Sequence, residues 1–241
     1  MDSMADLSAW RGLIVEGSLT GGARNEIHRG QLHGQEVVIH RSTRCEESLR
    51  WELDLLKHLH ANGCHVPEIV PADDGRRHVN GWRVQEFIHG RHATHDDAAA
   101  VRRELARVHQ CTADWSQRPD AASARSLLSA PAGTNDVGLE GLPGALAVKV
   151  RQAWLAVQPR DRCVIHGDPG GANALITTKG DCVLIDWDEA RVDDPLFDLK
   201  LTAGEERAAL AWEIVVCWKP EPSYARELAE QMLAGTGSRM L

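Results

Sequence analysis

Long apolar runs are absent from this sequence of 241 residues, and so is any block of lysine and arginine. The longest apolar stretches, such as residues 214–217, are far shorter than the roughly 20 residues that cross a bilayer as a helix. Acidic residues outnumber basic ones by 35 to 27, which gives a formal net charge of −8. Because nucleic acids and anionic membranes attract basic surfaces, this balance argues against both kinds of partner.

Cysteine pairs with a metal-binding or redox spacing are also missing. The six cysteines are scattered without a Cys-x-x-Cys pair, which favours the reduced thiols of a cytosol. The first ten residues lack the basic segment and the apolar run of a secretion signal, so we expect a cytoplasmic protein. The apolar share of 43% is enough for a buried core, and the length suits one large domain or two small lobes.

The first ninety residues are predicted to form mainly β-structure with one helix. A glycine-rich break over residues 17–22 follows a first extended stretch. For the helix, the spacing of Thr43 and Glu46 predicts a capping box, and Asn62-Gly63 predicts the end. Further strands are expected where β-branched and other apolar residues predominate, over residues 27–32, 36–40 and within 79–88.

Glu52 interrupts the apolar stripe of that helix, three residues after Leu49 and four before Leu56. A carboxylate in this position is partly removed from water and requires a cation or hydrogen-bond donors. The alternative is that the side chain reaches solvent at the edge of the stripe, because buried acids without a partner are rare.

Beyond residue 96 the pattern changes mainly to helix. Helices are expected over residues 98–108 and 145–157 and over the last forty residues, with a break at Pro220-Glu221-Pro222. Short strands are expected at 164–165, 174–176 and 182–185. The sequence therefore predicts an α+β fold of two lobes, a β-rich lobe over 1–90 and a mainly helical lobe over 91–241.

The most informative segment is CVIHGDPGGAN, which ends at Asn173 and is followed thirteen residues later by Asp186. In a His-x-Asp-x-x-x-x-Asn loop, the acid can accept a proton from a substrate hydroxyl while the amide oxygen faces a divalent cation. A second acid at the end of a hairpin strand supplies a stronger ligand for Mg²⁺. Residues of this kind also populate ordinary turns. The conjunction of motif, hairpin and strand-terminal acid favours the catalytic interpretation.

These motifs resemble the aminoglycoside phosphotransferase and choline kinase-like family, over nearly the whole chain. Residues 19–25 look like the glycine loop of the family, 51–67 like its helix C, and QEFIHG, residues 85–90, like its hinge. HGDPGGAN and LIDWDEA resemble its catalytic and metal motifs. The resemblance implies a bilobal protein-kinase-like fold and transfer of the γ-phosphoryl group of ATP or GTP to a hydroxyl of a small molecule.

The resemblance also implies roles for single residues. Asp168 would be the base or orienting carboxylate for the acceptor hydroxyl, and Asp198 would brace the catalytic loop through hydrogen bonds. Asn173 and Asp186 would hold Mg²⁺ on the nucleotide phosphates, with Asp188 in a further metal-binding or supporting role. The residues implied in nucleotide binding are Gly21, Gly22, His40, Arg41, Glu52, Gln85, Glu86, Phe87 and Ile88.

One departure from the family concerns the third strand, which usually carries a lysine or arginine that pairs with the helix C glutamate. Here His40 stands in that place and Arg41 follows it. Because successive strand residues point to opposite faces, both cannot serve without a bulge. We expect Arg41 to substitute through a local shift and His40 to act as a weaker cation, in preference to impaired nucleotide binding.

The sequence does not identify the acceptor. The negative net charge is compatible with a cationic acceptor such as an aminoglycoside, and so with antibiotic resistance. The alternatives are a metabolic kinase of choline, homoserine or a sugar, and a nucleotide-binding pseudokinase, which His40 motivates. Trp154, Trp212 and Trp218 are candidates for an acceptor pocket, although core packing is the expected role of such residues.

Overall fold

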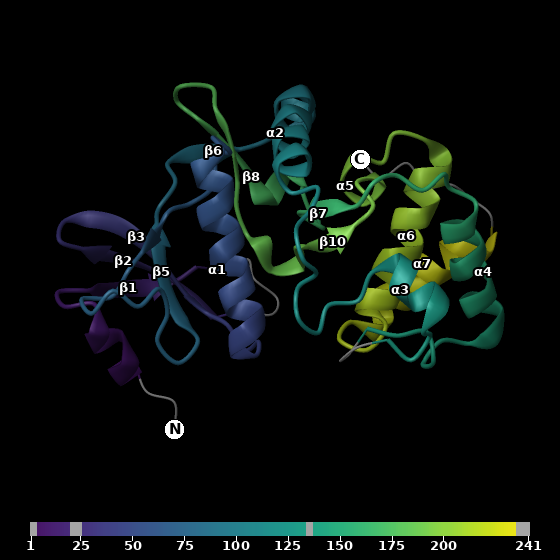
Figure 1. Ribbon diagram of the computed structural model, residues 1–241, viewed down its shortest axis with the longest axis horizontal. Coiled ribbons are helices and arrows are strands. Elements are labelled where there is room, and N and C mark those ends of the chain that lie inside the picture. The colour runs from purple at the N-terminus through teal and green to yellow at the C-terminus, as the bar shows by residue number, and fades with distance from the viewer. Residues whose placement is uncertain (1–3, 20–25, 134–136, 235–241) are drawn as a thin grey trace. The chain divides into compact units, whose positions relative to one another are not determined.

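The computed structural model describes residues 4–19, 26–133 and 137–234 (Figure 1). The chain divides into two units that interleave along the sequence. The first unit comprises residues 1–107 and 169–187, and the second comprises residues 108–168 and 188–241. Within the described ranges, no helix is long and apolar enough to cross a membrane.

An antiparallel five-stranded sheet dominates the first unit. Its strands, in spatial order, are β1 (Ile14–Ser18), β2 (Glu26–Leu32), β3 (Gln35–Arg41), β5 (Trp82–Glu86) and β4 (Ile69–Val70). The chain turns between β2 and β3 at His33 and Gly34, both with positive φ, which is the conformation that a tight hairpin requires. One face of the sheet packs on a core that includes Trp10, Ile39 and Val84. A short 3₁₀ helix, Met4–Ala9, precedes this sheet.

Helix α1 (Glu46–Ala61) lies between β3 and β4 in the chain. It ends at Asn62, and Gly63 follows with a φ of 77°, so the predicted helix end is confirmed. The predicted capping box is wrong. The N-cap is Cys45, without a side-chain cap hydrogen bond, and Glu46 is the first helical residue, whereas a capping box requires the acid at the third.

A second antiparallel sheet in the first unit joins distant parts of the sequence. Strand β6 (Gly90–His92) pairs with β8 (Ala174–Thr177), which pairs in turn with β9 (Cys182–Leu184). After β6 come a 3₁₀ turn, His95–Asp97, and helix α2 (Ala98–Cys111). The strands expected around residues 174–185 and the helix expected from residue 98 are thus confirmed.

The second unit is mainly helical. Pro222 opens the last helix, a position where proline loses no helical hydrogen bond, so the predicted interruption is confirmed. A two-stranded sheet of β7 (Cys163–Ile165) and β10 (Arg191–Asp193) accompanies the helices. The helices are α3 (Ala124–Ser129), α4 (Gly144–Leu155), α5 (Leu196–Leu199), α6 (Ala203–Cys217) and α7 (Pro222–Ala234).

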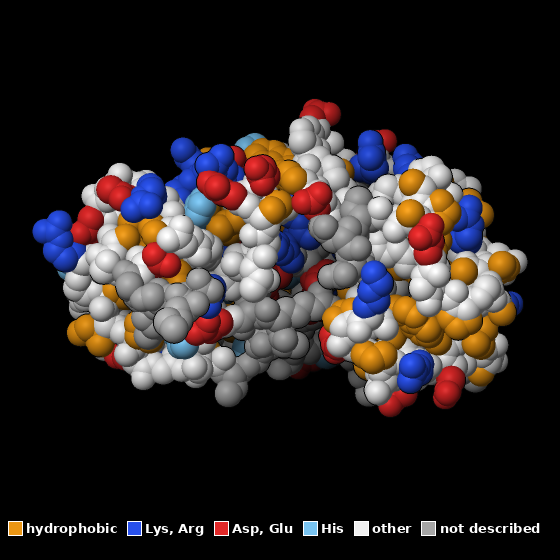
Figure 2. All heavy atoms as spheres, turned by 90° about the horizontal axis from the view of Figure 1, so that it is seen from below, with side chains coloured by type: hydrophobic (Ala, Val, Ile, Leu, Met, Phe, Trp, Pro, Cys, Tyr) orange, Lys and Arg blue, Asp and Glu red, His pale blue; other side chains and the backbone are white. Residues whose placement is uncertain are grey.

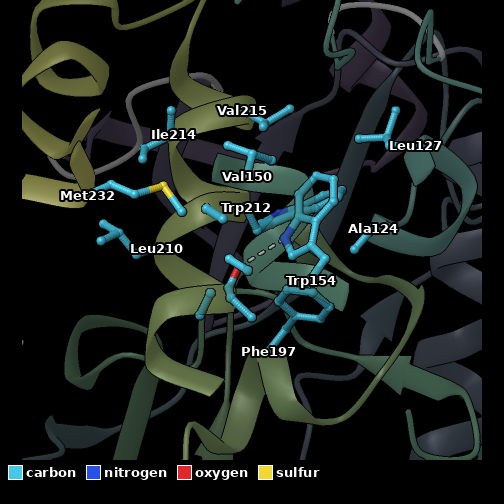
Figure 3. Close-up of a cluster of buried hydrophobic side chains, with 14 of the residues drawn as sticks. Ala124, Leu127, Val150, Trp154, Phe197, Leu210, Trp212, Ile214, Val215 and Met232 are labelled. Atoms are coloured by element: carbon cyan, nitrogen blue, oxygen red, sulfur yellow. Dashed lines mark hydrogen bonds between the residues drawn. The ribbon is translucent and has the colours of Figure 1, made fainter. Parts of the chain in front are cut away.

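The core of the second unit contains two of the three tryptophans weighed for an acceptor pocket, and the third, Trp218, is partly buried against it. Trp154 and Trp212 are buried together, and Phe197 packs beside them (Figure 3). The indole Nε1 of Trp154 donates a hydrogen bond of 3.1 Å to the carbonyl oxygen of Ala208, so its polar atom has a partner inside the core. Core packing is therefore the observed role. With an antiparallel sheet and a helical part, the α+β fold class is confirmed.

Candidate active site

The loop after β7 carries His166, Gly167 and Asp168, and one buried carboxylate fixes its backbone. Asp198 on α5 accepts hydrogen bonds of 2.9 Å from the backbone N–H groups of His166 and Gly167. The ring Nε2 of His109 lies 2.8 Å from the same carboxylate, which can only accept, so the imidazole donates. The predicted bracing by Asp198 is confirmed.

The charge state of Asp198 suits this role. Burial alone would raise its pKa, but the hydrogen bond from His109, the charges of His109 and His166 and the backbone N–H of Gly167 outweigh burial. The pKa of Asp198 therefore lies below its ordinary value. The carboxylate stays ionised near neutral pH and keeps both backbone donors of the loop satisfied.

Gly167 is required by the geometry of the loop. Its φ is +92°, and a Cβ built on it would lie 2.6 Å from the carbonyl oxygen of Glu189. No side chain fits there without displacing backbone. Asp168 follows Gly167 directly and is exposed, so the proposed catalytic carboxylate is accessible from solvent.

Two of the candidate metal ligands lie together in the first unit. The backbone N–H of Ile185 donates a hydrogen bond of 2.9 Å to the carbonyl oxygen of Asn173, and Asp186 is the next residue. Both Asn173 and Asp186 are half-buried. Asp186 adopts a φ of +59°, a left-handed conformation that few residues other than glycine, asparagine and aspartate tolerate. Such backbone strain is common at functional sites.

Amide and carboxylate oxygens are the donors that Mg²⁺ prefers, and Mg²⁺ commonly takes only one or two carboxylates from a protein and the rest from phosphates and water. The described residues contain no group of three or more His, Cys, Asp or Glu arranged to hold a metal ion. Asn173 and Asp186 fit the sparse Mg²⁺ set. Asp188 belongs to the second unit, where its backbone oxygen accepts a hydrogen bond of 2.6 Å from Arg118.

Glu52 on α1 is buried, with 1% of its side chain exposed. Its Oε1 lies 2.9 Å from Nη2 of Arg83, a residue of β5 whose side chain is 3% exposed. The prediction that Glu52 is removed from water and requires a cation is confirmed, and the alternative that it reaches solvent is wrong. Arg83 was not foreseen, although an arginine between Trp82 and Val84 in an expected strand is a signal for a buried cation.

His40 and Arg41 point to opposite faces of the sheet. The pairing of β3 with β2 and with β5 continues without interruption through both residues, so the predicted local shift is absent. His40 is 6% exposed and lies directly opposite Arg83. Burial, and then the charge of Arg83, hold the pKa of His40 well below its ordinary value. A neutral imidazole carries no charge, so the prediction that His40 acts as a weaker cation is wrong.

The side chain of Arg41 makes contacts on the other face of the sheet. Its guanidinium lies 5.4 Å from the ring centroid of Trp82 and 3.6 Å from Oε2 of Glu26. These are the contacts of a cation stacked on an aromatic ring at a sheet surface. The expectation that Arg41 takes the place of the strand lysine therefore loses its structural basis.

The hinge segment continues from β5. Gln85 is buried, and Glu86, Phe87 and Ile88 are half-buried. The N–H of Glu86 donates to the carbonyl oxygen of Glu68 at 2.9 Å, and the N–H of Phe87 donates to that of Glu36 at 3.2 Å. These two N–H groups are bonded within the protein, so recognition of a base would involve other backbone groups. The implied glycine-loop residues, Gly21 and Gly22, lie outside the described residues.

Comparisons with known proteins indicate a family and a fold. The model of the phosphotransferase enzyme family matches residues 18–237. No curated protein matches the chain. Similar solved structures include the microcompartment-associated aminopropanol kinase, with a TM-score of 0.65, 18% identity and 98% of each chain covered. The choline kinase LicA from Streptococcus pneumoniae has a TM-score of 0.63, 15% identity and 96% of each chain covered.

A third similar structure is a thermostable mutant of an aminoglycoside phosphotransferase in ternary complex with AMP-PNP and hygromycin B. Its TM-score is 0.56 at 16% identity, and 93% of this chain and 95% of that chain are covered. At such low identities the likeness to solved structures is one of fold, and that fold is the kinase-like one expected from the sequence.

Proposed function

The chain belongs to the phosphotransferase enzyme family, and from this premise we propose that it transfers the γ-phosphoryl group of a nucleoside triphosphate, ATP or GTP, to a hydroxyl of a small molecule. The observation that carries the proposal is the pair of hydrogen bonds from His166 and Gly167 to Asp198. They hold a rigid loop on which the next carboxylate, that of Asp168, is exposed. Phosphoryl transfer depends on such positioning more than on covalent chemistry.

In this proposal each polar residue has one task. The Asp168 carboxylate accepts a hydrogen bond from the acceptor hydroxyl, orients its oxygen toward the γ-phosphorus atom and receives its proton. The new oxygen–phosphorus bond forms as the bond from the γ-phosphorus to the bridging oxygen breaks, and the nucleoside diphosphate leaves. The side-chain oxygens of Asn173 and Asp186 would hold Mg²⁺, which would neutralise charge on the phosphates. Asp198 keeps the loop in place and does not touch the substrate.

ATP is the proposed donor, and GTP is the alternative that the experiment below separates. Support comes from the aminoglycoside phosphotransferase of similar fold, whose complex contains the ATP analogue AMP-PNP. The hinge residues Gln85 to Ile88 are proposed to lie along the purine, and Gly21 and Gly22 to approach the phosphates.

For the acceptor we propose a cationic amino alcohol, and aminoglycosides are the large members of this class. The proteins of similar fold are named for aminopropanol, choline and an aminoglycoside, each of which combines a positively charged nitrogen with a hydroxyl. A chain with a net charge of −8 attracts such molecules. If an aminoglycoside is the acceptor, the biological role is antibiotic resistance. An uncharged sugar, or homoserine, is the competing acceptor.

A small-molecule partner in the cytoplasm also fits the surface and the thiols. On the face shown in Figure 2, lysine and arginine side chains of the described residues are interspersed with aspartate and glutamate. All six cysteines are free thiols, four of them buried, which suits a reducing compartment. These observations support the proposal that neither a nucleic acid nor a membrane is the partner.

A transfer screen tests the proposed function. Purified protein with Mg²⁺ and γ-labelled ATP or GTP is incubated with aminoglycosides, choline, aminopropanol, homoserine and sugars, and labelled product is counted with and without EDTA. We expect EDTA-sensitive transfer to at least one cationic amino alcohol, at a kcat/KM at least tenfold above that for any sugar. Nucleotide binding without transfer to any acceptor would contradict the proposal and favour the pseudokinase.

A further inference from the structure

The fold does not require the buried ion pair between Arg83 and Glu52 for its stability. Both side chains are almost fully buried, between the five-stranded sheet and α1. Removal of two charges from water often costs more free energy than their attraction returns, and a well-packed apolar pair is frequently as stable. The stability of the fold therefore gives no reason for a guanidinium at this position.

The register of the sheet places Arg83 beside the position that the family fills with a cation. His40 on β3 and Arg83 on β5 are direct partners in the antiparallel pairing, so their side chains leave the same face of the sheet. Opposite residues in such a pair have Cα atoms about 5 Å apart. An arginine on β5 therefore reaches the volume that a longer cationic side chain at residue 40 would occupy.

His40 provides a second observation at the same place. The residue is more than nine-tenths buried, and its Nε2 has no hydrogen-bond partner among the described residues. Buried polar atoms in folded proteins nearly always have a partner, so an atom of this kind points to a group that binds from outside the chain. A neutral imidazole with its proton on Nε2 donates one hydrogen bond, which an anionic oxygen accepts well.

We propose that Arg83 supplies the permanent positive charge that contacts the phosphates of the bound nucleotide, with Glu52 as its positioning residue and His40 Nε2 as a neighbouring donor. The cation that the family carries on β3 is thus replaced by one on the neighbouring strand β5. A guanidinium carries five N–H donors in a planar fork, so it holds a carboxylate on one edge and a phosphate oxygen on another. This inference rests on the nucleotide binding proposed above.

Calorimetric titration with ATP and with adenosine, both in the presence of Mg²⁺, separates a phosphate contact from a structural role. We expect Arg83→Met to weaken ATP binding about tenfold to a hundredfold, the range for a lost charged hydrogen bond. Adenosine binding should stay within about threefold, because adenosine has no phosphate. The matched control is Arg77→Met, which removes another arginine–carboxylate pair of the same unit, that with Asp54. It should alter neither affinity.

A relocation variant tests the site of the charge. In the double variant His40→Lys/Arg83→Met, a lysine on β3 faces Glu52, and we expect ATP affinity to return to within about fivefold of wild type. If Arg83→Met fails to fold, Arg83→Lys replaces it, and its ratio of ATP to adenosine affinity should stay within about threefold of wild type.

Two results would overturn the inference alone: an unchanged affinity ratio in a folded Arg83→Met protein, or failure of both Arg83→Met and Arg83→Lys to fold, which would mark the pair as structural. A wild-type protein that binds neither ATP nor GTP would overturn the proposed function as well. The two failures are therefore distinguishable.

Discussion

The side chain of Asp198 shows how one residue fixes the loop that we propose to be catalytic. Its two oxygens accept the N–H groups of His166 and Gly167, and His109 donates to it from α2. The resemblance to the family implied such a brace. The donor from His109 was not foreseen, because a contact across 89 residues cannot be derived from local spacing.

Replacement of this carboxylate should affect both the loop and turnover. In Asp198→Asn the amide presents an N–H₂ group where an oxygen accepted a hydrogen bond, so one buried backbone donor loses its acceptor. We expect a loss of about 2–4 kcal/mol in the free energy of unfolding and a fall in kcat of at least about a hundredfold. Urea unfolding and steady-state kinetics measure these quantities, with the exposed Asp161→Asn as control. Wild-type kcat in the Asp198 variant would contradict the bracing role.

The effect of the same substitution on the free energy of unfolding should depend on pH. The pKa of Asp198 is lower in the folded protein than its ordinary value near 4, so ionisation of this group stabilises the fold. That contribution is complete above the unfolded pKa and is lost as the pH falls through the folded pKa. The difference in unfolding free energy between wild type and Asp198→Asn should be constant from about pH 5 to 7 and shrink below about pH 4. A difference that grows in acid would contradict this sign.

Cys163 and Cys182 should be chemically inert. Burial, and then nearby acidic charges such as that of Asp198, raise the pKa of Cys163 to about 12, and burial raises that of Cys182 to about 11. Because the thiolate is the reactive form, both should resist iodoacetamide at pH 8, while the exposed Cys45 is alkylated first. Peptide mass spectrometry after timed quenching measures the order. Labelling of Cys163 before Cys45 would refute it.

At the scale of single elements, α1 and β5 show which features could be predicted from the sequence and which could not. The helix was predictable from its apolar stripe, and the burial of Glu52 followed from its place in that stripe. The counterion of Glu52 could not be predicted, because strand β5 pairs with β3 only in the folded sheet. The register of that pairing decides that Arg83 faces α1. Local pattern identifies the buried charge, and only tertiary pairing identifies its counterion.

The loop of residues 166–168 depends equally on backbone conformation. Gly167→Ala places a Cβ against the carbonyl oxygen of Glu189 in a left-handed residue, whereas Gly180→Ala introduces the same left-handed strain with no atom within 4 Å. We expect Gly180→Ala to cost about 1 kcal/mol in unfolding free energy and to leave kcat unchanged. Gly167→Ala should cost about 1–3 kcal/mol more and lower kcat at least tenfold. Denaturation and kinetics of the pair give the comparison, and equal effects would contradict the close approach.

At the scale of the whole molecule, the division of the chain follows tertiary pairing more than sequence order. Strands β8 and β9 join the first unit because β8 pairs with β6, some 80 residues earlier in the chain. The motif HGDPGGAN consequently spans two units, with Asp168 in one and Asn173 in the other. Local residue patterns predicted the β-rich and helix-rich parts, but no such pattern specifies a pairing between distant strands. The assignment of nucleotide binding to residues 1–90 and of acceptor binding to residues 91–241 stays a prediction.

The most direct test of the central claim is phosphate transfer by Asp168→Asn, measured beside its nucleotide affinity. The substitution removes the proton-accepting charge at an exposed position, so the fold and the Mg²⁺–nucleotide site should survive. We predict that kcat for the best acceptor falls at least about a thousandfold, that the Kd for Mg²⁺-ATP stays within about threefold, and that the unfolding midpoint is unchanged. Transfer at the wild-type rate by a folded, ATP-binding Asp168→Asn protein would contradict the account.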